Sequence, residues 1–154
     1  MQGVYRLGDT IAAVTVAEPL LYISVPSTAL IQIIRATVSC QDDVTNEQLH
    51  CMITRPTGTK AGGAATTPIL MEPTGQASAC TCSSGDTAIT GLTNGDPNAA
   101  IAAGAVQKQS VWEYVPLPEE RVWVHNDEII LAIVDTITSS DLTAEIIYRE
   151  IKLS

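Results

Sequence analysis

Four cysteines are the residues of this chain with the widest scope for chemistry. Cys40 and Cys51 lie in segments where apolar and polar residues alternate, a pattern typical of β-strands. If residues 30–40 and 48–55 pair about a turn at 41–47, Cys40 faces Cys51, and opposed strand positions are close enough for a disulfide. The alternative is a pair of buried reduced thiols, which we favour because free cysteine is readily buried as a small apolar residue.

A metal site is the second chemistry to weigh. Cys80 and Cys82 form a Cys-x-Cys pair, and with His50 and His125 they contain the ligand types that zinc takes. Structural zinc sites combine two ligand pairs of characteristic spacing, and the sequence has no second Cys-x-Cys pair and no His-x₃₋₅-His. We therefore expect no metal and no cofactor. A metal-dependent enzyme built on these residues is kept as a remote alternative.

The two histidines are also the natural bases for nucleophilic catalysis. His50 alternates with its neighbours in a strand-like segment, and His125 precedes Asn126 and Asp127, which signal a turn. Both positions are more typical of solvent-facing residues than of a general base. No serine has a Gly-x-Ser-x-Gly context. The sequence therefore predicts no catalytic residue and a protein that is not an enzyme.

Aromatic residues gather in one short stretch, with Trp112, Tyr114 and Trp123 within a dozen positions. Trp112 and Tyr114 share a face of a strand by alternation. Ordinary core packing explains such a cluster, since tryptophan is largely buried on average. An anchor in a contact between subunits is the other explanation, because tryptophan and tyrosine concentrate there.

The composition of the chain limits the classes of protein to which it can belong. The chain has 154 residues, of which 45% are hydrophobic and 16% charged, so it is expected to form one folded domain over residues 1–154 rather than a disordered chain. Its net charge of −9 repels phosphate backbones, so no nucleic-acid partner is expected. The apolar runs are too short to span a bilayer and the first residues lack a signal-peptide core, so we expect neither membrane binding nor secretion.

Segments rich in β-branched residues alternate with clusters of Gly, Pro, Asn, Asp and Ser, which is typical of an all-β sandwich or barrel. We expect an antiparallel β-sandwich. The expected strands are residues 11–16, 20–25, 30–40, 48–55, 105–115, 121–124, 128–134 and 142–153. Residues 57–103 are small, polar and Gly/Thr-rich, and we expect a long loop region there with short edge strands at 69–72 and 79–82.

Residues 129–134 are apolar without interruption. Ile130 and Val134 would point to the face opposite to Ile129 and Leu131, so this strand should be covered on both sides. A neighbouring subunit could provide the second cover. Ile130 and Val134 are therefore interface candidates, together with the aromatic cluster, and we expect a homo-oligomer.

The order of segments carries a resemblance. Ala-Leu-Ile-Gln-Ile-Ile-Arg-Ala-Thr-Val-Ser at 29–39 and Glu-Gln-Leu-His-Cys-Met-Ile-Thr-Arg at 47–55 precede a Gly/Thr-rich loop and Pro-Ile-Leu-Met-Glu-Pro at 68–73. The corner Pro-Leu-Pro-Glu-Glu-Arg at 116–121 and two closing strands follow. Over most of residues 3–151, this order resembles a family of small proteins encoded by tailed bacteriophages and prophages. The segment around Cys80 and Cys82 departs from the family pattern.

The resemblance implies a structural, non-enzymatic component of a virion. The expected protein is a capsid decoration (cement) protein with a jelly-roll-like β-sandwich, a homotrimer that binds the major capsid protein and stabilises contacts between capsomers. The alternative is a tail or fibre module that binds a host receptor, which should present exposed aromatic residues at loop tips.

Overall fold

The computed structural model describes residues 2–42, 46–56, 60–72, 75–89 and 100–153. The fold is almost entirely β, as the sequence predicts, with ten strands and one short 3-10 helix in these residues. The elements are β1 (Gln2–Val14), β2 (Glu18–Cys40), β3 (Gln48–Thr54), β4 (Lys60–Ala65), β5 (Ile69–Leu70), β6 (Thr81–Ile89), β7 (Ala100–Gln107), β8 (Trp112–Tyr114), η1 (Pro118–Glu120), β9 (Trp123–Ile133) and β10 (Ser140–Lys152).

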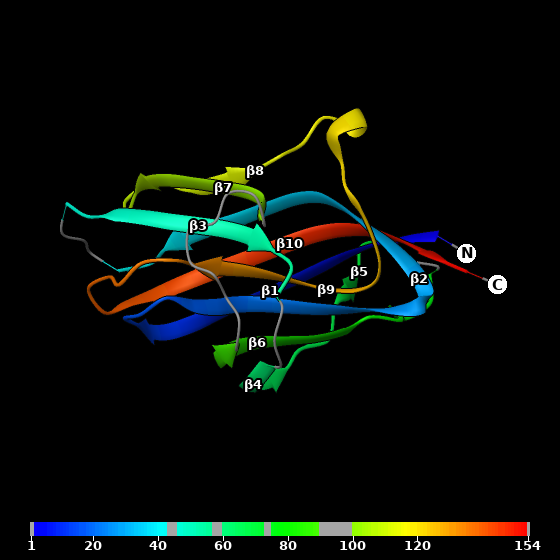
Figure 1. Cartoon of the computed structure of the whole chain (residues 1–154), viewed down its shortest axis with the longest axis horizontal. Coiled ribbons are helices and arrows are strands. Elements are labelled where there is room, and N and C mark those ends of the chain that lie inside the picture. Colours follow the sequence, from blue (N-terminus) through cyan, green and yellow to red (C-terminus); the bar gives the residue numbers. More distant parts are fainter. Residues whose placement is uncertain (1, 43–45, 57–59, 73–74, 90–99, 154) are drawn as a thin grey trace.

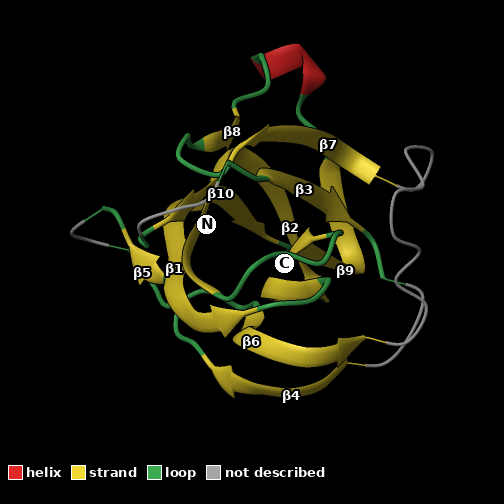
Figure 2. Cartoon of the chain, turned by 90° about the vertical axis from the view of Figure 1, so that its left-hand side faces the viewer, coloured by secondary structure: helices red, strands yellow, loops and turns green. Residues whose placement is uncertain are grey.

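The strands form one open antiparallel sheet with the main order β5-β1-β10-β2-β9-β3-β7. The long strand β2 pairs with four other strands. Its first half lies between β9 and β6. Its second half pairs with β10 on one edge, and with β8 and the start of β9 on the other edge. β4 pairs with β6 at the bottom of the molecule (Figure 1). Figure 2 shows these strands arranged around a common interior. The arrangement is compatible with a jelly-roll-like sandwich without establishing that topology.

β2 and β9 each run through a position where a break between two strands is expected. Pairing between them is interrupted between Val25 and Leu30, and Pro26, which has no N–H to donate, lies in this interruption. On the partner strand, Asn126 has a positive φ of 47°. The expected turn at residues 125–127 is therefore an irregularity inside β9, and both strands continue past it.

A single core fills the interior. Alternation in β10 buries Leu142, Ala144, Ile146 and Tyr148, while the residues between them are partly exposed. Residues from β1, β2, β3, β8 and β9 pack into the same hydrophobic cluster. A second, smaller cluster on the other face of the sheet consists of Tyr22, Ile130 and Ala132.

The hairpin expected between residues 30–40 and 48–55 is wrong. β3 pairs with β9 on one edge and with β7 on the other, and the second half of β2 pairs with β10 and β8. Cys40 and Cys51 therefore do not face each other. Cys40 faces Leu142, and Cys51 faces Ile133 on one side and Gly104 on the other. Apolar alternation is satisfied equally well by these partners, so the pattern alone did not select the true one.

The region expected as a long loop, residues 57–103, is more ordered than the sequence indicates. It contributes β4, β5, β6 and the first residues of β7, while residues 57–59, 73–74 and 90–99 lie outside the described part. β5 is a short edge strand, as expected. β6 is longer than the expected strand at 79–82 and is not an edge, because it lies between β2 and β4.

Candidate interaction surface

The connection between β8 and β9 projects from the sheet. β8 pairs with residues 36–38 of β2 and the first residues of β9 pair with residues 30–32 of the same edge. Both ends of the connection are therefore held about 13 Å apart along β2. Residues 115–122 leave the sheet in this interval, and η1 forms the tip that projects beyond the strands in Figure 2.

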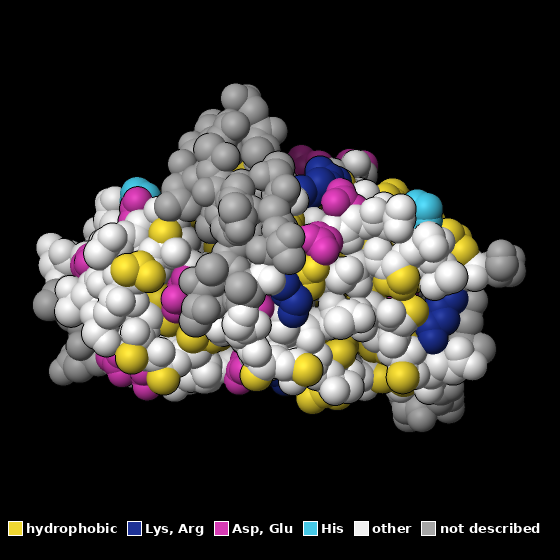
Figure 3. Space-filling model, turned by 60° about the horizontal axis from the view of Figure 1, so that its bottom comes forward, with side chains coloured by type: hydrophobic (Ala, Val, Ile, Leu, Met, Phe, Trp, Pro, Cys, Tyr) yellow, Lys and Arg dark blue, Asp and Glu magenta, His cyan; other side chains and the backbone are white. Residues whose placement is uncertain are grey.

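Large apolar side chains are exposed along this projection. Val115 is 60% exposed, Leu117 58% and Trp123 45%. We call these three residues the loop surface. On the face in Figure 3, hydrophobic side chains occur instead as small separate groups among polar atoms. Because a soluble domain usually keeps large apolar side chains apart, a loop that presents three of them is a candidate for contact with a partner.

Local hydrogen bonds hold the loop in shape. Glu120 N–H donates to the Leu117 carbonyl at 2.9 Å, and Leu117 N–H donates to the Glu120 carboxylate at 3.2 Å. Pro118 occupies the first turn of η1, where a missing N–H costs nothing, and Pro116 further restricts the backbone. Leu117 is therefore displayed from a pre-ordered turn, which lowers the entropy lost on binding.

The structure separates the predicted aromatic candidates. Trp112 is only 5% exposed and belongs to the main core, and Tyr114 packs partly buried against it. Core packing is thus the correct interpretation for Trp112. Trp123, at the first position of β9, is the exposed member of the three.

The strand expected to be covered by a neighbouring subunit is covered within the protomer. Ile129 and Leu131 lie in the main core, and Ile130 and Ala132 are completely buried in the small second cluster. Ile130 therefore offers no surface to a partner. Val134, just after β9, is partly exposed.

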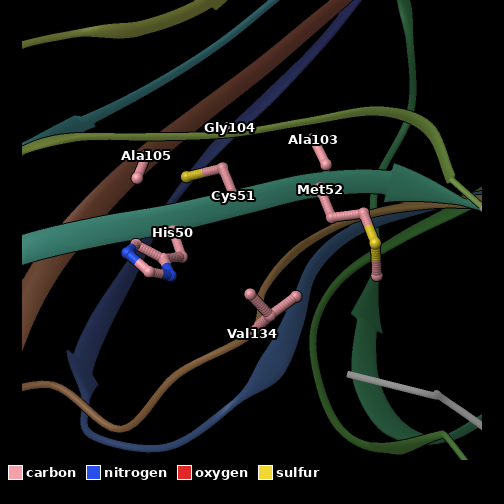
Figure 4. Close-up of a pocket in the computed structure, with 7 residues that line it drawn as sticks. All are labelled: His50, Cys51, Met52, Ala103, Gly104, Ala105 and Val134. Carbon is pink, nitrogen blue, oxygen red and sulfur yellow. The ribbon is translucent and has the colours of Figure 1, made fainter. Parts of the chain in front are cut away.

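Val134 lies on the wall of a shallow, mainly apolar pocket of about 320 Å³ between β3 and β7 (Figure 4). The same wall includes His50, whose Nδ1 lies 2.6 Å from a carboxylate oxygen of Asp135. This pair links the end of β9 to β3 at the surface. It gives His50 a structural partner where the sequence suggested only exposure.

The four cysteines are free thiols in the structure. Cys51 is buried, and burial raises the pKa of its thiol to about 12. Cys40, at the end of β2, is partly exposed. The favoured interpretation of Cys40 and Cys51 as reduced thiols fits this arrangement, and the disulfide between them does not form.

Cys80 and Cys82 lie in a buried polar cluster that the sequence did not reveal. The buried Glu150 carboxylate accepts hydrogen bonds from Ser78 Oγ at 2.5 Å and from Ala79 N–H at 3.0 Å, and Cys80 Sγ lies 3.5 Å from it. Burial raises the pKa of Cys82 to about 12, and burial and the Glu150 charge raise that of Cys80. Thiols with such pKa values stay protonated at neutral pH and are poor nucleophiles and ligands.

Through these hydrogen bonds, Glu150 connects the segment before β6 to β10. The sequence did contain a signal for the burial of Glu150: it follows the buried Tyr148 by two residues, and residues two apart in a strand share a face. Tyr148 takes part through its hydroxyl, 2.9 Å from Ser78 Oγ, and its ring stacks on Tyr5 with centroids 5.6 Å apart.

The expected metal-ligand candidates are not brought together. Cys80 and Cys82 are buried at β6, His50 is paired with Asp135 on β3, and the His125 ring bonds the Ser27 carbonyl at 3.1 Å. Within the described residues, no group of three or more His, Cys, Asp or Glu side chains is placed to hold a metal ion.

Three comparisons with known proteins give no relative: no protein-family model, no curated protein and no solved structure matches this chain. In the part of the chain that the structure describes, no helix has the length and hydrophobicity to cross a membrane.

Proposed function

We propose that this chain is a structural protein of a tailed-phage virion, a decoration protein that binds the outer surface of the head through the loop surface. The observation that carries the proposal is the pre-ordered projection with Val115, Leu117 and Trp123 exposed at its tip and base. The similarity in segment order to small proteins of tailed phages supports the virion context, and the Pro-Leu-Pro-Glu-Glu-Arg corner of that similarity is this projection.

The size of the loop surface suits repeated, low-affinity contacts. Burying one Leu or Val side chain completely contributes about 1.5–3 kcal/mol, so three partly exposed side chains give modest binding per copy. Many copies on a regular shell gain in avidity when they are linked as oligomers. A stable fold with a small adhesive projection meets that requirement.

Self-association is part of the proposal, as a homotrimer, but residues 129–133 cannot supply its surface because both faces of that segment are buried. Open sheet edges are the better location. Among the described strands β4 pairs only with β6, so its other edge forms no strand pairing there and can pair with a second copy. Light scattering of the purified protein tests this: a stable monomer at micromolar concentration would contradict it.

A reconstitution experiment tests the head-binding function. Particles of the phage that encodes this chain are prepared without it, purified protein is added, and bound protein is measured after sedimentation and located by immunogold labelling. The proposal predicts labelled heads. It also predicts that Val115→Asp with Leu117→Asp lowers binding at least about tenfold, because charge at a buried contact is costly.

The matched control is Ile69→Asp, on the edge strand β5, which is 66% exposed and outside the loop surface. Its binding should stay within about twofold of the unmodified protein, since surface substitutions away from a contact usually have small effects. Equal loss in both variants, or no binding to heads by the unmodified protein, would contradict the proposal.

A second function, a tail or fibre module that binds a host receptor, has one observation in favour. Such a module is expected to expose aromatic residues at loops, and Trp123 is 45% exposed at the base of the projection. In the same labelling experiment, signal confined to the tail would favour this function over head decoration.

A further inference from the structure

Two arginines stand out among the cationic side chains because their Nε atoms are buried without a hydrogen-bond partner among the described residues. Those with a partner are Arg6, Arg35, Arg55, Lys60 and Lys108, each near a carboxylate, and Lys152, which donates to Gln76 and Ala77. Arg121 and Arg149 form no ion pair with the described residues. In both, the Nε atom is buried and has no hydrogen-bond partner there.

The two unpaired arginines belong to one place in the fold. Arg149 on β10 is in register with Gln32 on β2, and Gln32 is in register with Trp123 on β9, so the three side chains lie in a row on one face of the sheet. Arg121 precedes Trp123 by two residues with an extended backbone. Its carbonyl accepts a hydrogen bond from Gln32 Nε2 at 3.4 Å, which places it beside the row.

No cross-strand neighbour of Arg149 supplies a counter-charge. The cross-strand neighbours of Arg149 are Val4 and Gln32, which are uncharged. Gln32 is only 7% exposed, so the site is partly withdrawn from water. A buried guanidinium N–H without an acceptor is unfavourable, and a ligand that supplies an acceptor removes that cost.

We propose that Arg121, Arg149, Gln32 and Trp123 bind a carboxylate that a partner polypeptide presents. A planar guanidinium matches a carboxylate through two parallel N–H donors, and each of the two arginines offers such a pair. The half-exposed indole of Trp123 provides apolar contact for the residues that flank the carboxylate.

The charge of the chain narrows the ligand to a single carboxylate rather than a polyanion. The net charge is −9, and the exposed Glu119 and Glu120 lie in the loop next to Arg121. A phosphate backbone or other polyanion would be repelled by these acids at several of its charges, whereas an apolar segment with one acidic side chain meets less repulsion. The partner is thus an apolar segment with an isolated acidic residue.

This inference rests on the proposed function in that Trp123 is part of the loop surface, and it adds the chemistry of the partner. Its test needs only the purified chain and no virus particle. Failure of the carboxylate site would therefore leave head binding through Val115 and Leu117 intact, and failure of head binding would leave the carboxylate site open to measurement.

The experiment compares two blocked peptides, acetyl-Gly-Leu-Glu-Leu-Gly-amide and the same peptide with Gln in place of Glu. Arginine Nε–H and tryptophan indole N–H signals of the isotope-labelled full chain are followed by NMR during titration. We expect the Glu peptide to shift the signals of Arg121, Arg149 and Trp123 saturably, and the Gln peptide to bind at least about tenfold more weakly.

Substitutions sharpen the assignment. Arg149→Lys keeps the charge and loses the planar fork, so the Glu peptide should bind about tenfold more weakly. Arg35→Lys is the matched control on the neighbouring strand β2, where Arg35 already pairs with Glu113 at 2.8 Å, and affinity should stay within about twofold. The Arg149→Lys substitution removes no hydrogen bond of Nε, because this atom has no partner among the described residues. The comparison of the two peptides uses the unmodified chain, so it does not depend on whether a variant folds.

Three results would overturn the proposal: no shift with the Glu peptide at about 10 mM, equal shifts with the Glu and Gln peptides, or equal loss of affinity in Arg149→Lys and Arg35→Lys. Inorganic phosphate at the same concentration is the last arm. A stronger response of the arginine signals to phosphate than to the Glu peptide would show a general anion site and would contradict carboxylate recognition.

Discussion

Gly104 on β7 lies directly against the indole of Trp112 on β8. A Cβ built on Gly104 would stand 3.2 Å from Trp112 Nε1, closer than ordinary van der Waals contact. The absence of a side chain at Gly104 therefore allows Trp112 to enter the core beneath β7. The base of the projecting loop, which follows β8 directly, depends on this contact.

Gly104→Val should destabilise the fold. The added side chain meets a large buried ring that has little room to move, and overpacking of this kind costs about 1–3 kcal/mol. Urea unfolding measures the loss, and the fluorescence of Trp112 should change at the same time. A control is Gly8→Val on β1, where the nearest atom, the Ala144 carbonyl oxygen, lies 3.4 Å from the built Cβ. A larger loss at Gly8 would contradict the role of the Gly104 contact.

Trp112 and Trp123 should differ sharply in stability measurements. Trp112→Ala removes a ring that is 5% exposed and should cost about 3–5 kcal/mol. Trp123→Ala removes a side chain that is 45% exposed and should cost much less, about 1 kcal/mol or below. Denaturant unfolding of both variants decides the matter, and equal losses would mean that the burial described for Trp112 is wrong.

Lys108 and Glu47 should make stability sensitive to acid. The buried Lys108 ammonium lies 3.1 Å from Glu47 and 2.9 Å from the Thr138 carbonyl, and Glu47 also accepts the Thr138 N–H at 3.0 Å. The hydrogen bond from Lys108 lowers the pKa of Glu47 below its ordinary value of 4.5. Because the folded-state pKa is depressed, this stabilisation is present above pH 4.5 and is lost as the pH falls through the lower folded value.

Lys108→Met should therefore lower the Tm at pH 7 by roughly 5 °C, and the gap to the unmodified protein should narrow below about pH 4. Scanning calorimetry at several pH values measures both. Lys152→Met, which removes a more exposed amine near Gln76, should give a small difference with little dependence on pH. A gap for Lys108→Met that is constant down to pH 2 would contradict the linkage.

The cysteines should react in two classes. At about pH 8 the buried thiols of Cys51 and Cys82, with pKa values near 12, should resist alkylation of the native protein, while the partly exposed Cys40 should react first. All four should react after unfolding. Mass spectrometry of peptides reports each site. Rapid native labelling of Cys82, or an intact mass showing a Cys40–Cys51 disulfide, would contradict the structure.

Alternation predicted the all-β class and some strands well, but other strand bounds and the strand pairing poorly. β1 begins at Gln2 although a strand was expected only from residue 11, and the strand expected at 105–115 is divided between the end of β7 and β8. β10 was expected at residues 142–153 and occupies 140–152, because Leu142, Ile146 and Tyr148 mark one face at a period of two. The same period is shared by β2, β3 and β9, so any antiparallel pair among them places apolar beside apolar. The hairpin between β2 and β3 failed for this reason, and only the folded chain distinguishes a sequence neighbour from a distant strand.

The strands in the middle of the chain could not be predicted from the sequence for a different reason. β6 is built from small polar residues, and its stability comes from buried hydrogen bonds such as Ser83 Oγ to Asp86 at 2.7 Å rather than from apolar alternation. The interaction surface was equally hidden. Leu117 and Val115 could be read as core residues or as surface, and their exposure follows from the position of β8 and β9 along one edge of β2.

A cryo-electron reconstruction of the phage that encodes this chain would show whether the chain decorates the head. We expect copies of the fold on the outside of the head, oriented so that the projection at residues 115–122 touches the shell and Trp123 is covered. Density for the fold on the tail alone, or heads whose surface lacks it in particles that contain the protein, would contradict it.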